Sequence, residues 1–189
     1  MEDKNKKYPS YMGEFYALNP TKFEKRKNNV KPKLYLGLAV VAVIMVIFPG
    51  LIPMTSWLVR TIGVIAALLC LLAAYMSSFD IYNIPSGGKI KDLGVKKFKR
   101  DETNPQRILK AFLEKDLEYL AELPGGSSEP VQLHIEEDPI GHEMYCLLTT
   151  YDSDSNIVGL ADVITLSGSE YDENIDLVKQ MIKEENDNK

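Results

Sequence analysis

Three side chains that can bind a metal ion or act in catalysis lie close together in the last third of the sequence: His134, His142 and Cys146. A zinc site takes four ligands, or three and a water molecule. A turn at residues 138–141 would place His134 opposite Met144 and away from Cys146 in a pair of antiparallel strands. No orienting acid accompanies a Cys–His nucleophile pair. We therefore predict neither a metal site nor a catalytic residue here.

A second polar pattern resembles the opening of a calcium loop, with Asp152, Asp154 and Asn156 at alternate positions. Such a loop also needs Gly at its sixth position and Glu at its twelfth. This chain has Ile157 and Val163 there. Asp, Ser and Asn are equally common in hairpin turns. The pattern predicts a turn, and we expect no bound metal and no cofactor.

The elements that position these residues follow a long apolar stretch at residues 34–79, which is broken only by a short turn and Arg60. Residues 34–54 carry no charge, and about 20 apolar residues are enough to span the hydrocarbon of a bilayer. A second apolar run covers residues 58–79. We predict a transmembrane hairpin of two helices, at residues 34–54 and 58–79.

Charge is distributed unevenly around this hairpin. Residues 1–33 have a net charge of +5, residues 80–100 of +4, and residues 101–189 of −15. An excess of Lys and Arg at helix ends marks the cytoplasmic side. We predict that both termini are cytoplasmic, in a bacterial plasma (inner) membrane. The acidic distal region opposes nucleic acid as a partner.

Small residues recur at spacings of three and four along the second apolar helix, and such a stripe lets another helix approach closely. The favoured neighbour is the first helix, through Val40, Val43, Ile44 and Ile47. The alternative is a partner protein or a second copy of this chain. The predicted helix-packing or partner interface consists of Gly63, Ala67, Cys70, Ala74 and Ser77.

Basic and aromatic residues on both sides of the hairpin are placed to meet the lipid bilayer, where Lys and Arg are attracted by the anionic inner leaflet and Trp favours the interface. The predicted headgroup contacts are Lys25, Arg26, Lys27, Trp57, Lys96, Lys97, Lys99 and Arg100. On this reading residues 1–33 are a basic cytosolic tail, and residues 80–103 are a basic juxtamembrane linker.

The distal region, residues 104–185, has the pattern of a small cytosolic domain. A helix capped by Asn104 precedes strands at residues 131–136, 142–151 and 156–166, and a last helix begins at Ser169. The middle strand is apolar on both faces and should be central. The order α-β-β-β-α predicts an α+β domain with an antiparallel sheet, followed by a polar tail at residues 186–189.

These features predict a non-enzymatic integral membrane adaptor or accessory subunit. Its acidic cytosolic domain would engage a protein partner, with self-association as another possibility. The alternative function is a membrane-anchored ligand-sensing or regulatory module, in which the small α+β domain is the sensor.

Overall fold

A computed structural model describes residues 8–28, 30–76, 79–99, 104–126 and 130–187. The chain forms two compact units. The hairpin unit is Lys25–Ile81, and the sheet unit combines Met1–Glu24 with Tyr82–Lys189. The predicted α+β class and the antiparallel sheet are confirmed.

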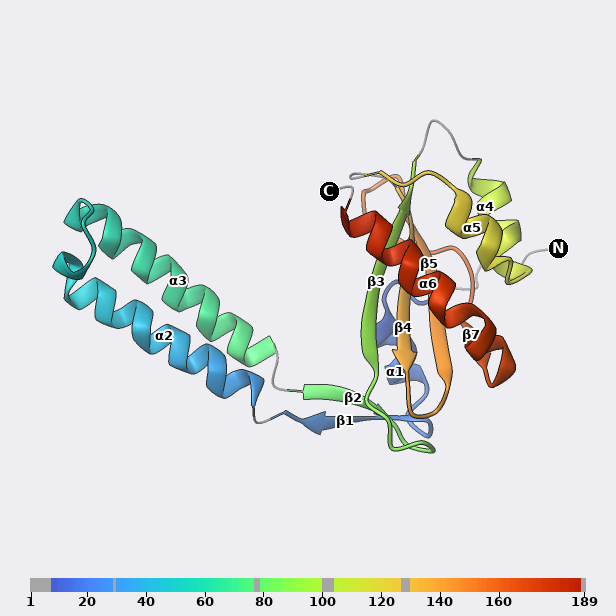
Figure 1. Ribbon diagram of the computed structural model, residues 1–189, viewed down its shortest axis with the longest axis horizontal. Coiled ribbons are helices and arrows are strands. Elements are labelled where there is room, and N and C mark those ends of the chain that lie inside the picture. Colours follow the sequence, from blue (N-terminus) through green and yellow to red (C-terminus); the bar gives the residue numbers. More distant parts are fainter. Residues whose placement is uncertain (1–7, 29, 77–78, 100–103, 127–129, 188–189) are drawn as a thin grey trace. The chain divides into compact units, whose positions relative to one another are not determined.

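The sheet unit is built on a five-stranded antiparallel sheet (Figure 1). Its path runs β3 (Lys91–Phe98), β4 (Val131–Asp138), β5 (Glu143–Tyr151) and β6 (Ile157–Gly159), and β7 (Ile164–Ser167) also pairs with β5. β5 is central, as expected, and its residues 144–149 are all buried. The single strand expected at residues 156–166 is two short strands, which pair with opposite ends of β5.

Three helices cover one face of this sheet: α4 (Pro105–Leu113), α5 (Leu117–Glu122) and α6 (Ser169–Asp187). Asn104 caps α4 as predicted, because its side chain accepts from the Gln106 N–H. The helix expected to follow as one piece is interrupted at Lys115, whose φ is +59°. Asp116 then caps α5 through the Tyr119 N–H. The core includes Phe98, Ile108, Phe112, Leu120, Leu133, Ile135, Met144, Leu166 and Val178.

The opposite face of the sheet is covered by the segment expected to be a basic tail. Helix α1 (Met12–Leu18) buries Met12 and Tyr16, and β1 (Phe23–Lys27) begins with the buried Phe23. The rings of Tyr16 and Phe23 lie 4.6 Å apart, and Phe23 lies 5.3 Å from Tyr145 of β5. The tail prediction is wrong for the described residues 8–24, because their aromatic side chains complete the second layer of the core. Residues 1–7 lie outside the described residues.

The expected linker at residues 80–103 is also folded where the structure describes it. Its first residues belong to β2 (Phe79–Asn83), which pairs with β1 in a two-stranded sheet. Its later residues form β3, which pairs along its length with β4. The burial of Lys96 and Phe98, two residues apart, has the period of two that a strand requires. The prediction of a basic linker is wrong for residues 91–98, which belong to the sheet.

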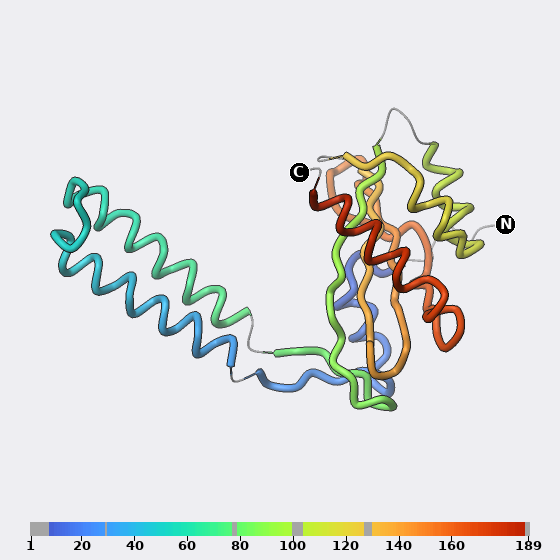
Figure 2. Tube along the Cα trace, viewed as in Figure 1, coloured from blue at the N-terminus to red at the C-terminus, as the bar shows by residue number. Residues whose placement is uncertain are grey.

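The hairpin unit contains α2 (Lys31–Ile47), the short 3₁₀ helix η1 (Pro49–Leu51) and α3 (Ser56–Met76). Helices α2 and α3 run side by side (Figure 2). The helix predicted for residues 34–54 ends at Ile47, because Pro49 excludes Phe48 from the helical conformation. The second helix begins two residues earlier and ends three residues earlier than predicted, and Phe79 belongs to β2.

Among the described residues, α3 is the one helix long and apolar enough to cross a membrane. Helix α2 has 17 residues. Of the two predicted spanning helices, α3 therefore has the length and composition to cross a membrane, and α2 does not meet the same length criterion.

The small-residue stripe of α3 meets α2 through Gly63. A Cβ placed on Gly63 would lie 2.7 Å from Cγ2 of Val46 and 3.1 Å from the carbonyl oxygen of Ala42. Ala67 and Ala74 are also buried, Cys70 is half-buried, and Ser77 lies outside the described residues. The prediction of which side of α2 makes this contact is wrong, because the four residues named for it are all exposed: Val40, Val43, Ile44 and Ile47.

Candidate functional site

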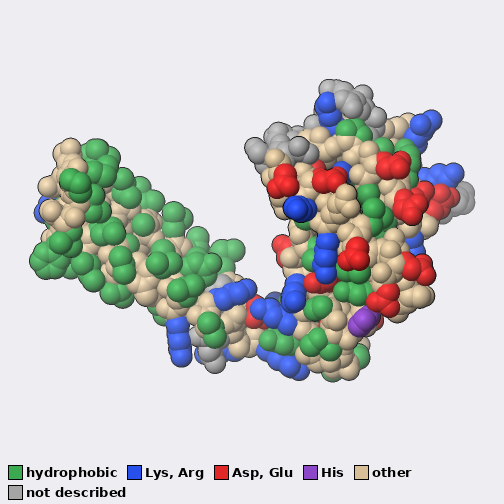
Figure 3. Space-filling model, in the orientation of Figure 1, with side chains coloured by type: hydrophobic (Ala, Val, Ile, Leu, Met, Phe, Trp, Pro, Cys, Tyr) green, Lys and Arg blue, Asp and Glu red, His purple; other side chains and the backbone are tan. Residues whose placement is uncertain are grey.

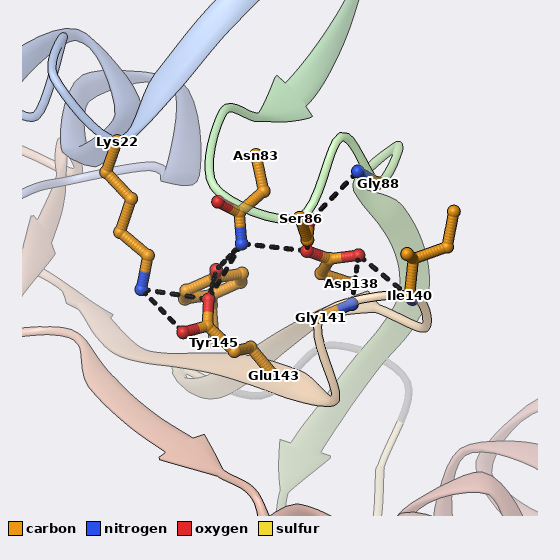
Figure 4. A network of polar contacts seen from close by, with 9 residues as sticks. All are labelled: Lys22, Asn83, Ser86, Gly88, Asp138, Ile140, Gly141, Glu143 and Tyr145. Carbon is orange, nitrogen blue, oxygen red and sulfur yellow. Dashed lines mark hydrogen bonds and ion pairs between the residues drawn. The ribbon is translucent and has the colours of Figure 1, made fainter.

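A polar network lies in the sheet unit at the point where the chain leaves for the hairpin unit and returns from it (Figure 4). We call it the junction network. It consists of the side chains of Lys22, Asn83, Ser86, Asp138, Glu143 and Tyr145.

Asp138 is the centre of the junction network and is fully buried. Its Oδ1 accepts the N–H groups of Ile140 at 3.1 Å and Gly141 at 3.0 Å. Its Oδ2 accepts from Nδ2 of Asn83 at 2.7 Å and from the Ser86 hydroxyl. A Cβ on Gly88 would overlap this carboxylate, so the backbone there requires glycine. Four donors therefore hold this carboxylate in place.

Glu143 holds the other half of the network. Nζ of Lys22 lies 2.9 Å from its Oε2, and Nδ2 of Asn83 donates to the same oxygen at 2.9 Å. The Tyr145 hydroxyl also donates to Glu143. Burial, together with the Glu143 charge, raises the pKa of Tyr145. The phenol therefore stays protonated and acts as a donor. The Lys22 ammonium lies 5.1 Å from the centre of the Tyr145 ring, at cation–π distance.

The network fixes the two chain segments that lead to the hairpin unit. Lys22 and Asn83 each lie within three residues of a unit boundary, and the Ile84 N–H donates to the Lys22 carbonyl at 2.8 Å. Among the described residues, one buried side-chain atom has no hydrogen-bond partner, Oδ1 of Asn83. The arrangement can hold a loop in place, and we assign it a positioning role.

The sequence analysis missed this network because its members are far apart in the chain. Asn83 is 55 residues from Asp138, and Lys22 is 121 residues from Glu143. The local signal that was present is the pair of glycines that follow Ser86, together with the Asp138-Pro139-Ile140-Gly141 turn. Turn residues indicate a change of direction, but they do not identify the segment that will contact the turn.

Two carboxylates beside Asp138 are also engaged inside the sheet unit. The Tyr16 hydroxyl donates to Glu136 at 2.8 Å, and burial raises the pKa of that carboxyl. Glu137 lies on the opposite face, where it accepts from the Tyr171 hydroxyl and pairs with Nζ of Lys179 at 3.2 Å. The acidic run at residues 136–138 is therefore part of the interior.

The His and Cys side chains do not converge. His134 lies opposite Leu147 and Cys146 opposite Ile135. The expected pairing of His134 with Met144 is wrong, because the strands pair as far as Asp138 and Glu143, which shifts the register by three residues. In the described ranges no group of three or more His, Cys, Asp and Glu side chains is placed to hold a metal ion.

Cys146 is fully buried, and burial raises the pKa of its thiol to about 12. Because the thiolate is the reactive form, we expect iodoacetamide to leave Cys146 unmodified in the folded protein at pH 8 and to modify it in 6 M guanidinium. Peptide mass spectrometry of a Cys70→Ala variant measures this directly. Rapid alkylation of the folded protein would contradict the burial.

His134 contacts the Thr149 hydroxyl at 3.2 Å, and burial lowers its pKa from the ordinary value. Below a pH of about 6.5 the unfolded chain takes up a proton that the folded chain resists. We therefore expect the free energy of unfolding to fall as pH drops from 7.5 to 5.5, and less so in His134→Gln. Urea unfolding at each pH measures the slope. Equal slopes for the two proteins would contradict this.

The calcium-like pattern is a closed turn. Oδ1 of Asp152 accepts the N–H groups of Asp154 at 2.9 Å and Asn156 at 2.8 Å. Both bonds are made within the loop that joins β5 to β6, so the predicted turn is confirmed.

The predicted lipid contacts divide between the two units. Lys25, Arg26, Lys27 and Trp57 are exposed in the hairpin unit. The predicted lipid contact of Lys96 is wrong, because its side chain is buried in the sheet unit, where Nζ donates to the Ala121 carbonyl. Lys97 and Lys99 are half-buried in the same unit, and Arg100 lies outside the described residues.

A surface groove of about 390 Å³ lies between α5 and α6. Its apolar lining residues include the buried Met181. Three exposed carboxylates, those of Glu118, Glu122 and Glu184, also line the groove. We call it the acidic groove; its lining residues are Glu118, Ala121, Glu122, Leu177, Gln180, Met181 and Glu184.

The full chain was compared with known families, proteins and structures. No protein-family model, no curated protein and no solved structure matches the chain.

Proposed function

We propose that the chain is a membrane-anchored adaptor. In this proposal α2 and α3 insert in the bilayer of a bacterial plasma membrane. The sheet unit stays on the cytoplasmic side, where its acidic groove engages a protein partner.

The observation that carries the proposal is the apolar surface of the hairpin unit. Leu34, Leu68, Leu69 and Leu72 each expose more than half of their area, and 22% of the apolar window of α3 is buried. Green side chains cover the visible side of both helices (Figure 3). Soluble monomers rarely expose contiguous apolar patches above a few hundred Å². In a bilayer, lipid chains cover these apolar side chains, and water does not contact them.

A two-helix transmembrane hairpin needs the residues that follow α2 as well as α2 itself. The uncharged part of α2, residues 34–47, extends about 21 Å at 1.5 Å per residue, less than the hydrocarbon thickness of about 30 Å. The uncharged residues 48–54, which include η1, continue the apolar stretch toward α3. Local thinning of the bilayer accommodates a helix that is shorter than the hydrocarbon layer at modest cost.

The sheet unit supports a topology with both termini on one side. Residues 8–24 and 82–187 pack into one core, so the chain must enter and leave the bilayer from the same compartment. The excess of Lys and Arg before α2 favours the cytoplasm for that compartment.

Cysteine labelling tests the anchor and its direction together. Thr55→Cys lies in the connection between α2 and α3, and Asp154→Cys lies in the exposed β5–β6 turn. In intact cells, a membrane-impermeant maleimide should label Thr55→Cys, and Asp154→Cys should react only after permeabilisation. Labelling of both positions in intact cells, or release of the chain by alkaline carbonate, would refute the anchor.

Photo-crosslinking tests the partner. A benzoylphenylalanine at Gln180, on the rim of the acidic groove, should give a discrete adduct in cells. The same group at Glu173, which is also exposed on α6, should not. The charge reversals Glu118→Lys and Glu122→Lys should together lower the yield at least threefold, since they oppose a basic partner. Equal adducts at both positions would reject the groove as the partner surface.

A further inference from the structure

Exposed cations gather at one end of the hairpin unit. Lys25, Arg26 and Lys27 are consecutive on β1, and all three are exposed. Lys31 and Lys33 follow in the first turn of α2, also exposed. Among the described residues of the hairpin unit, the remaining cation is Arg60, near the start of α3. We call the five side chains the basic end.

The basic end is held in a fixed arrangement. Oδ1 of Asn28 accepts the N–H groups of Val30 at 2.9 Å and Lys31 at 3.2 Å. Nδ2 of Asn28 donates to Asp80 of β2 at 2.8 Å, and Nζ of Lys31 lies 3.7 Å from the same carboxylate. These contacts tie β1, the start of α2 and β2 to one another. Asp80 is the one carboxylate among the described residues of this unit, so cations are in large excess.

The cations are also at the correct level for a bilayer surface. Lys33 directly precedes the exposed Leu34, where the uncharged stretch begins. If the apolar surface of α2 occupies the hydrocarbon, its first turn and β1 reach the layer of lipid headgroups. A headgroup that carries a phosphate and a net negative charge offers acceptors for these ammonium and guanidinium groups.

We propose that the basic end selects anionic phospholipids, with phosphatidylglycerol as the probe class. The proposal rests on the membrane anchor, and it adds that β1 contacts headgroup phosphates through Lys25, Arg26 and Lys27. The attraction weakens as salt increases, because exposed charges are screened.

The test uses the full chain in vesicles of equal parts phosphatidylcholine and phosphatidylglycerol. Spin-labelled lipids of each type measure which headgroup the protein retains in its first lipid shell. We expect phosphatidylglycerol to be preferred about threefold or more, since each basic residue near an anionic surface contributes appreciably. The variant Lys25→Gln/Arg26→Gln/Lys27→Gln should lower the preference toward one, and 0.5 M NaCl should lower it for the natural chain.

The matched control is Arg107→Gln/Lys110→Gln/Lys183→Gln, which removes the same three charges from exposed positions of the sheet unit. It should keep the preference. An unchanged preference in the β1 variant, or an equal loss in the control, would overturn the lipid proposal while the anchor stands. A chain that the mixed vesicles do not retain would overturn the anchor and this proposal with it.

Discussion

Asp138→Ala will destabilise the sheet unit more than any other single substitution in the junction network. The substitution leaves the Ile140 and Gly141 N–H groups and the Ser86 hydroxyl without the acceptor they have now. Each buried polar group without a partner costs about 1–3 kcal/mol. We expect a loss of roughly 3–5 kcal/mol, which is a large part of the 5–15 kcal/mol that is typical of a folded domain.

Hydrogen exchange of the full chain in detergent, followed by mass spectrometry, measures this loss. Protection of the β4 and β5 amides should fall sharply in Asp138→Ala and less in Asp138→Asn, which keeps an acceptor for the two N–H groups. Asp154→Ala is the matched control, because Asp154 is exposed in a turn. If the β4 and β5 amides are equally protected in Asp138→Ala and in Asp154→Ala, Asp138 is not the centre of the network.

Gly63→Ile should separate α2 from α3. The added Cβ would already be 2.7 Å from Val46 and 3.1 Å from the Ala42 carbonyl, and the larger side chain extends further. Overpacking of this kind costs about 1–3 kcal/mol. Gly37→Ile is the matched control, because nothing lies within 4 Å of a Cβ at Gly37.

Unfolding in sodium dodecyl sulfate gives the readout for this pair. Trp57 is the single tryptophan of the chain and lies on α3, so its fluorescence reports on the hairpin unit. The midpoint should move to lower detergent fraction for Gly63→Ile and stay near that of the natural chain for Gly37→Ile. Equal midpoints would show that close approach at Gly63 does not hold the helices together.

Local patterns accounted for much of the fold. The uncharged stretch from Leu34 identified the hairpin, because apolar length is read directly from the chain. Asn104 before Pro105 identified the start of α4 for an equally local reason, since a cap and its helix are neighbours. The apolar faces of residues 142–151 identified the central strand.

Patterns with two physical meanings were assigned incorrectly. The mixed apolar and basic residues of 91–98 suit both a basic linker and a strand, and only the presence of β4 selects the strand. The aromatic residues around Tyr16 suit both a basic cytosolic tail and a core. The contacts of the Tyr16 and Phe23 rings with the buried Tyr145 of β5 decided for the core.

The sequence by itself therefore determined where the apolar hairpin lies, which residues turn the chain, and which strand is central, because each depends on neighbouring residues. The tertiary structure alone decided that residues 8–24 fold with residues 82–187, that Lys96 is buried, and that Asn83 and Lys22 meet the 138–143 turn. Those contacts join segments 55 to 121 residues apart, and their free energy arises from burial and pairing that no local pattern contains.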